Sequence, residues 1–404
     1  MPGSLIVAGA RTPIGKLAGA LSALAAVDLG GTAIAAALER AGVAPEDVDY
    51  VVLGHVLQAG QGQITARQAA VRAGIPMATP ATTVNKVCLS GLNAIYLADQ
   101  MIAAGDADIV VAGGMESMTN APYLLPGARA GWHMGDATAV DAMLHDGLSC
   151  PFDLCSMGEG TERAITAVSG PASVASRDRQ DAVAAMSHER ATAAAKAGIL
   201  AEEIVPVAVP QRRGDPVMVD TDEGIRPGTT TDTLGALRPV FSADGSITAG
   251  NSSQISDGAA AVVVASAAAV ERLGLRPLGE VVSYGQVAGP DTSLLHQPSR
   301  AALRALDRAG LAVADVDLFE MNEAFAAVVV AAMDELGIGP GVTNVNGGAI
   351  ALGHPIGMSG ARLALTLLLE LGRRGGGLGV AALCGGGGQG DALVVRAAPG
   401  ISRM

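Results

Sequence analysis

The feature that most constrains the fold of this chain is an internal duplication. Four segments of the first part recur in the second part in matching type and, apart from one excursion, in the same order. The pairs are 37–49 with 305–317, 83–91 with 344–360, 108–117 with 379–388, and 257–266 with 390–398. Self-similarity of this kind indicates two units of the same supersecondary structure. The chain is therefore expected to fold as two similar halves.

Each half is predicted to be an α/β unit. Segments with helical spacing alternate with short runs rich in Val and Ile, in the order strand, helix, strand, helix, strand, strand. The stretch from Met118 to Gly250 has no repeat partner and is rich in Pro, Gly and Asp. It is expected to be an excursion from the first half, with one clear helix near Arg177 to Ala197.

The duplication and the excursion together predict three domains. The first comprises residues 1–117 together with 251–271, the inserted loop domain comprises 118–250, and the last comprises 272–404. A chain of 404 residues is long enough for this, since a single core stops growing at about 250–300 residues.

Composition excludes several classes of function. The formal net charge is −13, which argues against binding to nucleic acid or to an anionic membrane, and any polyanionic ligand must meet a local basic patch. The longest apolar run, 259–270, is too short to span a bilayer, and the start MPGSLIVAGARTPIG lacks the pattern of a signal peptide. The four cysteines form no CxxC pair and histidine is scarce, so no metal site and a reducing, cytoplasmic location are expected.

The segment from Pro80 to Gly114 holds a candidate nucleophile. A helix is predicted from about Ser90 to Ala104, followed by a strand over 109–112. Cys88 stands just before this helix, where unpaired backbone N–H groups and the positive end of the helix dipole favour a thiolate. The alternative is that Cys88 is a small buried hydrophobic residue, which is a common fate of free cysteine.

Other candidate residues lie in the equivalent loops. Two packed α/β layers bring such loops together at the strand ends, which would place Cys88, His354 and Cys384 in one pocket. Asn322 follows the strand DLFEM and offers an amide, although a turn or cap is an equal reading. Cys384 precedes the glycines 385–388, whose N–H groups can converge on an oxyanion. A plain loop, a phosphate cradle, or a structural role for His354 remain alternatives at this point.

The motifs VCLSG, NEAFA, GGAIALGHPIGMSGAR and CGGGGQG, in this order, resemble the four motifs of the thiolases. The resemblance runs from the GARTPIG segment to the last predicted strand and is closest to the acetyl-CoA acetyltransferase branch. It implies a five-layer α/β/α/β/α fold with a loop domain that binds coenzyme A, in a homotetramer built from dimers. It also implies reversible condensation of two acetyl-CoA to acetoacetyl-CoA, with acyl-CoA and CoA as substrates, no separate cofactor, and a place in fatty-acid metabolism.

The resemblance also implies a role for each motif residue. Cys88 resembles the nucleophile that becomes acetylated, and His354 the residue that activates it and helps to bind the second thioester oxygen. Asn322 resembles the residue that holds a water in that same oxyanion hole. Cys384 resembles the acid/base that takes the α-proton of the second acetyl-CoA and protonates the leaving CoA sulfur. The backbone N–H groups of Cys88 and Gly386 would form the other oxyanion hole.

The coenzyme A tunnel of the family falls on five further positions, implied by the resemblance alone. They are Met157, Arg226, Thr233, Ala249 and Ser253.

Three features depart from the family pattern. Ser156 stands where several biosynthetic thiolases have a histidine, and the turn 286–290 replaces the usual MGxGP pattern. Both leave the acyl-chain preference open. Cys150 and Cys155 match no motif, and they are interpreted as ordinary loop-domain residues with some scope for a redox role.

Three other functions compete with an acetyl-CoA acetyltransferase. A degradative 3-ketoacyl-CoA thiolase of broader chain length would use the same residues in the cleaving direction. A condensing ketoacyl synthase has a similar fold but uses Cys-His-His, whereas here Asn322 takes the place of one histidine and a second cysteine is present. A non-enzymatic lipid-binding relative is disfavoured because all four motif residues are present.

Overall fold

A computed structural model describes residues 4–168 and 176–397 of the chain. Its centre is a ten-stranded mixed sheet with the order β14-β15-β16-β13-β1-β12-β5-β3-β4, and β2 pairs with β12. The strands are β1 (Leu5–Arg11), β2 (Gly15–Lys16), β3 (Tyr50–Gly54), β4 (Ala81–Val84), β5 (Ile109–Ser117), β12 (Ser256–Ala265), β13 (Gly279–Ala288), β14 (Leu318–Met321), β15 (Gly377–Gly385) and β16 (Gln389–Ala397).

The sheet consists of two halves with the same strand order. β1-β12-β5-β3 in the first half corresponds to β13-β16-β15-β14 in the second. In each half the pair farther from the centre of the sheet, β3 with β5 or β14 with β15, is parallel, and the next pair inward, β5 with β12 or β15 with β16, is antiparallel. The halves join where Leu5 and Ile6 of β1 pair with Glu280 and Gly279 of β13. The duplication in the sequence is thus a duplication of topology.

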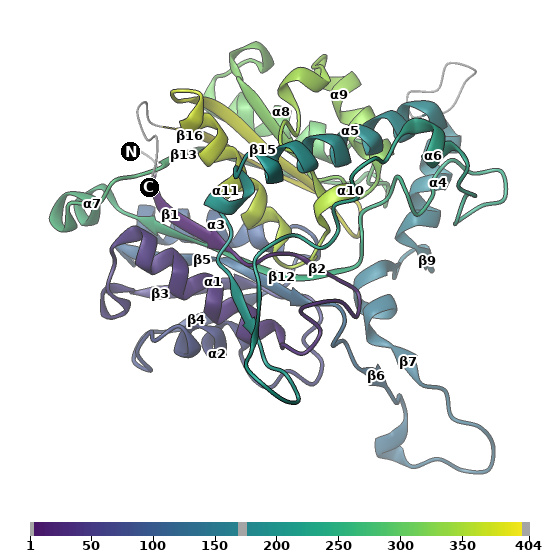
Figure 1. Cartoon of the computed structure of the whole chain (residues 1–404), viewed down its shortest axis with the longest axis horizontal. Helices are drawn as coiled ribbons and strands as arrows, with labels where there is room; N and C mark the ends of the chain where they lie inside the picture. The colour runs from purple at the N-terminus through teal and green to yellow at the C-terminus, as the bar shows by residue number, and fades with distance from the viewer. Residues whose placement is uncertain (1–3, 169–175, 398–404) are drawn as a thin grey trace.

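Helices form three layers around the two halves (Figure 1). The middle layer contains α3 (Ser90–Ala104) and α11 (Ser359–Arg373), which pack against each other and against strands of both halves. The outer layers contain α1 (Ala26–Ala41), α2 (Thr65–Arg72) and α7 (Ala267–Leu273) on the first half, and α8 (Gln297–Ala309) and α9 (Ala326–Leu336) on the second. This is the expected five-layer α/β/α/β/α arrangement.

Alternation along the strands produces these layers. On β12, Val262 and Val264 face the middle layer, whereas Val263 faces the outer helices. Successive side chains of a strand point to opposite faces, so a strand covered on both faces must be apolar throughout. All ten residues of β12 are buried accordingly.

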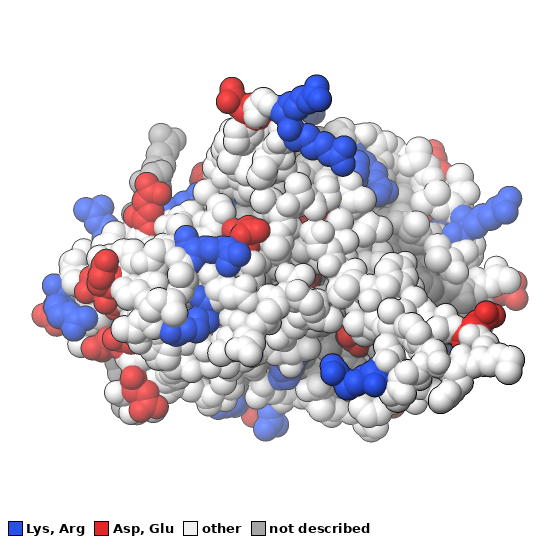
Figure 2. All heavy atoms as spheres, turned by 90° about the horizontal axis from the view of Figure 1, so that it is seen from below, with Lys and Arg blue, Asp and Glu red and all other residues white. Residues whose placement is uncertain are grey.

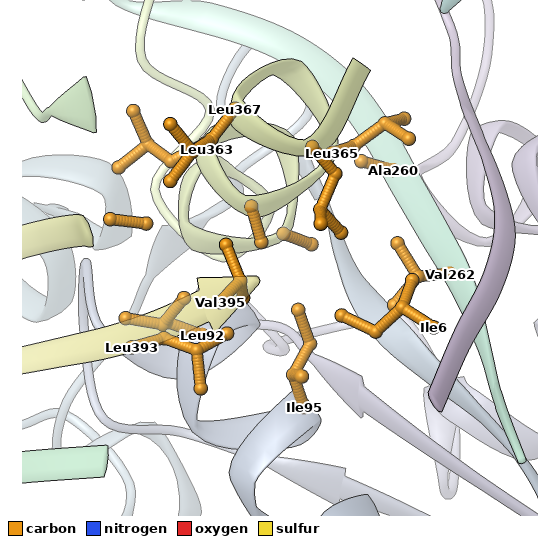
Figure 3. Packing of buried hydrophobic residues seen from close by; sticks show 14 of the residues in the cluster. Ile6, Leu92, Ile95, Ala260, Val262, Leu363, Leu365, Leu367, Leu393 and Val395 are labelled. Atoms are coloured by element: carbon orange, nitrogen blue, oxygen red, sulfur yellow. The ribbon is translucent and has the colours of Figure 1, made fainter. Parts of the chain in front are cut away.

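The middle layer holds the core that both halves share (Figure 3). Leu92 and Ile95 of α3 and Leu365 of α11 lie between strands of the two halves, and all three are fully buried. Burying one such side chain contributes about 1.5–3 kcal/mol, so neither half can be separated from this layer without a large loss.

Helix α3 occupies the residues predicted for it, and Gly105 ends it with a φ of 78°. The strand after it is longer than expected, running through Ser117 and not ending at Ala112, because β12 pairs along its whole length. The 18 residues from Val87 to Ala104 have a mean hydropathy of 1.3 and are long and apolar enough to span a bilayer. A core helix meets the same criterion, and α3 packs in the middle layer.

The excursion forms small hairpins and helices beside the main body. The hairpins pair β6 (Tyr123–Leu124) with β7 (Val140–Asp141), β8 (Ser149–Cys150) with β9 (Cys155–Ser156), and β10 (Val207–Val209) with β11 (Val217–Val219). The helices are α4 (Met157–Val168), α5 (Arg177–Lys196) and α6 (Thr231–Gly235), with a π-helix over Met143–Leu148. The predicted helix is confirmed as α5, one residue shorter, while the domain limits stay a prediction.

Charged side chains are spread over the surface. On the face drawn in Figure 2, basic and acidic residues are interspersed among wide uncharged areas. Only 16% of residues are charged, so an anionic ligand depends on its immediate contacts and not on a long-range field.

Close backbone contact between α3 and α11 depends on glycine. The duplicated Ser-Gly pairs begin these helices, and a Cβ on Gly360 would lie 2.3 Å from the nitrogen of Leu92. We expect Gly360→Ala to lower the free energy of unfolding by about 1–3 kcal/mol, because the helices must move apart. Gly341→Ala is the matched control, since no atom lies within 4 Å of its added Cβ. Equal urea midpoints for the two variants would contradict the expectation.

Candidate active site

A cavity of about 440 Å³ lies where loops from the two halves meet. Cys88 comes from the loop before α3, His354 from the loop before α11, and Cys384 and Gly386 from the end of β15 and the turn after it. The remaining wall is largely apolar and includes Leu148 and Ile356. The fold thus brings Cys88, His354 and Cys384 into one cavity, as the sequence predicted.

A strained turn presents Cys88. Val87 has a φ of 51°, in the left-handed region that β-branched residues rarely adopt and that costs about 1–3 kcal/mol. Ser90 Oγ holds the turn, since it donates to Val87 O at 2.6 Å and accepts from Lys86 N–H at 2.8 Å. The Lys86 ammonium binds both carboxylate oxygens of Asp391 on β16, which ties the turn to the second half.

Burial keeps the Cys88 thiol protonated. The apolar surroundings raise its pKa to about 12, although hydrogen bonds from the backbone N–H groups of Cys88 and Gly386 act in the opposite direction. The expectation of a lowered pKa from the helix terminus is therefore wrong, because the loss of hydration outweighs the amide donors. Both N–H groups thus lie close to the Cys88 sulfur, and the oxyanion hole expected from them stays a prediction.

His354 is a buried, neutral imidazole. Ser359 Oγ donates its hydrogen to Pro355 O at 2.9 Å. His354 Nδ1, which lies 2.6 Å from Ser359 Oγ, is therefore assigned as the donor to that hydroxyl oxygen. Nε2 then carries a lone pair and faces the Asn322 amide nitrogen at 3.3 Å. Burial, with a smaller effect of Arg362, lowers the His354 pKa to about 3. The imidazole is therefore neutral near pH 7, and Nε2 is its unprotonated nitrogen.

Asn322 contributes an unpaired hydrogen-bond acceptor, its side-chain oxygen, next to His354. Its N–H donates to Ala382 O at 2.9 Å, which fixes the end of β14 beside β15. Its side-chain Oδ1 is buried and, within residues 4–168 and 176–397, has no hydrogen-bond partner. A buried unpaired oxygen of this kind is costly unless a ligand or water completes it.

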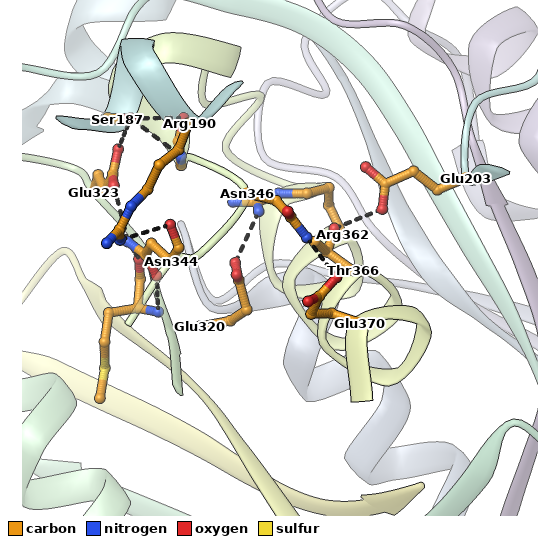
Figure 4. A network of polar contacts seen from close by, with 12 residues as sticks. Ser187, Arg190, Glu203, Glu320, Glu323, Asn344, Asn346, Arg362, Thr366 and Glu370 are labelled. Atoms are coloured by element: carbon orange, nitrogen blue, oxygen red, sulfur yellow. Dashed lines mark hydrogen bonds and ion pairs between the residues drawn. The ribbon is translucent and has the colours of Figure 1, made fainter. Parts of the chain in front are cut away.

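A buried polar network fixes the loop that contains Asn322 (Figure 4). Glu323 accepts from Ser187 Oγ of α5 at 2.6 Å, from Ile350 N–H at 3.0 Å and from Asn344 Nδ2 at 2.9 Å. Asn344 Oδ1 in turn accepts from Met321 N–H at 2.8 Å. The network joins helix α5, the end of strand β14 just before Asn322, and the short helix α10 (Ala349–Leu352) that leads to His354.

Cys384 is the second thiol of the cavity. It lies at the end of β15, opposite Gly390 in the ladder with β16, and is 1% exposed. Burial raises its pKa further than that of Cys88, and the nearby Cys88 adds to the effect. Two neutral thiols, one imidazole and two N–H groups near the Cys88 sulfur suit acyl transfer followed by proton abstraction.

Comparison with known proteins identifies the family. The family model of the thiolase N-terminal domain matches residues 4–268, and that of the thiolase C-terminal domain matches residues 275–397. The chain belongs to the thiolase family. It is 55% identical over 392 residues to a probable acetyl-CoA acetyltransferase of Mycolicibacterium smegmatis, which covers 97% of this chain and 100% of that protein.

Two further relatives of this thiolase show the breadth of the match. A probable acetyl-CoA acetyltransferase of Mycobacterium tuberculosis is 54% identical over 98% of this chain and 100% of its own length. An acetyl-CoA acetyltransferase of Cupriavidus necator is 50% identical over 97% of this chain and 98% of its own.

The positions expected to bind coenzyme A divide into two groups in this thiolase. Met157, Ala249 and Ser253 line the cavity, as does Ser156. The other two do not line it: Arg226 is exposed and donates its backbone N–H to His188, and Thr233 is exposed in the capping turn of α6. Their role in ligand binding stays a prediction.

Glu116 is a supporting residue next to the site, outside the cavity lining, that sequence reasoning missed. Its buried carboxylate accepts from the N–H groups of Val56, Leu57 and Gly357 at 3.0–3.1 Å, and His55 Nε2 lies 3.3 Å away. Burial raises the Glu116 pKa to about 7. It fastens the end of β5 to the loop of His354. The sequence feature that could have revealed Glu116 is its position as a carboxylate at the end of an otherwise apolar strand.

The protonation state of Cys88 gives a direct test. We expect the rate of Cys88 alkylation by iodoacetamide to keep rising from pH 7 to pH 9 and beyond, because its pKa is about 12. Cys88 should still be modified first, since it is half-buried whereas the other three cysteines are buried. Peptide mass spectrometry after brief labelling measures both. A plateau below pH 8 would mean that the thiolate is already formed at neutral pH.

Proposed function

We propose that this thiolase is an acetyl-CoA C-acetyltransferase, which condenses two acetyl-CoA to acetoacetyl-CoA and CoA through an acetyl-Cys88 intermediate. The observation that carries the proposal is the meeting of Cys88, His354 and Cys384 in one small, largely apolar cavity. The relatives named acetyl-CoA acetyltransferase support it over nearly the full length of the chain.

The first step is transfer of the acetyl group to Cys88. The sulfur attacks the thioester carbon while its proton passes to His354 Nε2, the unprotonated nitrogen of the neutral imidazole. The carbonyl oxygen becomes negative next to the N–H groups of Cys88 and Gly386. Removing one such donor typically costs about 3–4 kcal/mol of transition-state stabilisation. The leaving CoA sulfur takes the proton of Cys384.

The second step forms the new carbon–carbon bond. The Cys384 thiolate, left by the first step, removes an α-proton from the second acetyl-CoA. The enolate oxygen then lies beside the His354 imidazolium and a water held by Asn322, whose buried Oδ1 is available to hold it. The enolate attacks acetyl-Cys88, and the released thiolate recovers its proton from His354. Each residue thereby returns to its starting protonation state.

The five expected ligand contacts are proposed as follows. Met157, Ala249 and Ser253 contact the pantetheine arm, because they line the cavity next to the thiols. Arg226 and Thr233 contact the adenine and diphosphate end, which lies outside the cavity. Exposed cationic and hydroxyl groups suit that part of an anionic ligand.

Assembly and location extend the proposal. A homotetramer is supported by the projecting segment that runs from β6 to β7 (Figure 1), where Tyr123, Leu125, Trp132 and Met134 are exposed. The four free cysteines fit a location in the reducing cytoplasm. The proposal also places the enzyme in fatty-acid metabolism, with CoA thioesters as substrates and no further cofactor.

Acyl-chain length separates this proposal from a degradative thiolase of broader range. We expect kcat/KM for thiolysis to be about tenfold or more higher with acetoacetyl-CoA than with 3-ketooctanoyl-CoA, because fitting extra methylenes costs about 1–3 kcal/mol. The 3-ketohexadecanoyl thioester extends the series with the same CoA moiety. Equal values along the series would favour the degradative enzyme.

The two thiols should act in different steps. Cys384→Ser should still accept an acetyl group on Cys88, but α-proton exchange should fall by about 100-fold or more, because a hydroxyl is a much weaker base than a thiolate. Deuterium wash-in at the methyl group of acetyl-CoA measures the exchange, and intact-protein mass measures acetylation. Cys88→Ser is the matched control that should lose acetylation. Normal exchange in Cys384→Ser would assign the base to another group.

A further inference from the structure

The cysteines outside the active cavity face each other across a hairpin. Cys150 of β8 and Cys155 of β9 are direct partners in the antiparallel register, and the structure holds both as free thiols. Directly opposed residues have Cα atoms about 4.5–5.5 Å apart, within the range of about 4.4–6.8 Å that a disulfide needs. Their side chains share one face of the ribbon, and both are buried.

The strands of this hairpin form part of the cavity wall. The neighbouring register pair, Ser149 and Ser156, lines the cavity that contains Cys88, and so do Leu148 and Met157 on either side. A change in the twist of the hairpin therefore moves the surface that faces the acyl group.

The tip of the hairpin touches the loop that follows Cys384. The Phe152 ring lies 3.3 Å from where a Cβ on Gly387 would stand. The Asp153 carboxylate accepts a hydrogen bond from Thr292 Oγ1 of the second half. The tip thus links the inserted segment to the glycine turn that provides the Gly386 N–H.

The reduced thiol helps to shape this tip. Cys150 Sγ accepts from Asp153 N–H at 3.5 Å, and its S–H donates to Asp153 Oδ2 at 3.8 Å. Formation of an S–S bond removes that S–H and draws the sulfur toward Cys155. The hydrogen bond from the S–H to the Asp153 carboxylate, which also binds Thr292, is then lost.

We propose that Cys150 and Cys155 form a reversible redox modification site, whose oxidation by a low-molecular-weight disulfide such as glutathione disulfide reshapes the cavity wall and lowers turnover. One protein thiolate attacks a sulfur of the small disulfide and releases one thiolate. The second protein thiolate attacks the resulting mixed disulfide and releases the other. The two protein protons pass to the two released thiolates, so two protein thiols are oxidised and one small disulfide is reduced to two thiols.

The catalytic thiols must be separated from this pair in the test. The double variant Cys88→Ser/Cys384→Ser retains Cys150 and Cys155 as its remaining cysteines. After treatment with glutathione disulfide, we expect its mass to fall by two hydrogen atoms. In denaturant, where burial no longer protects a thiol, both cysteines should resist iodoacetamide until dithiothreitol is added, whereas both should react at once in the untreated variant. Persistence of two free thiols, or only a stable mixed disulfide with glutathione, would overturn the proposal.

Activity measurements then test whether oxidation of Cys150 and Cys155 lowers turnover. We expect the oxidant to cause a several-fold loss of thiolysis in the wild-type enzyme that dithiothreitol restores. The Cys150→Ala/Cys155→Ala variant, whose substitutions lie outside the catalytic residues, should keep most of its activity under the same treatment. Equal loss in both proteins would assign the inactivation to Cys88 and Cys384 and would overturn the regulatory part. If the alanine variant folds poorly, Cys155→Ser, which retains the size of the side chain, takes its place.

Discussion

Backbone contact between α3 and α11 is the constraint on which the rest of this thiolase depends. Gly91 and Gly360 let the two helices approach so closely that a Cβ on either would meet backbone atoms of the other helix. The helices begin with the duplicated Ser-Gly pairs, and the loops before them carry Cys88 and His354. The packing that joins the halves therefore also sets the spacing of Cys88 and His354.

Burial, and not the helix terminus, governs the electrostatics of the site. The same exclusion of water raises the pKa of the Cys88 thiol and lowers that of His354, so the resting pair is neutral. A neutral pair avoids holding an ion pair in an apolar cavity, where desolvation is expensive. In the proposed mechanism, charge develops only during the reaction, beside the N–H groups of Cys88 and Gly386.

Much of the fold and part of the site could be predicted from the sequence. The duplication predicted the repeated strand order, and the spacing around Leu92 and Ile95 predicted the bounds of α3, because these are local or periodic signals. The position of Arg226 relative to the cavity could not be predicted, since an irregular loop carries it and tertiary packing sets its course. Glu116 was missed because its partners, Val56 and Gly357, lie far away in the sequence.

The sequence by itself determined which chemical groups meet. Cys88, His354 and Cys384 occupy equivalent or neighbouring loops of two copies of one topology, and stacking of the copies brings those loops together. Only the tertiary structure decided the protonation state of these groups and which face of the β8–β9 hairpin holds Cys150 and Cys155. The physical reason is that a pKa in a cavity depends on how much water is excluded by side chains from distant segments, and no local pattern encodes that exclusion.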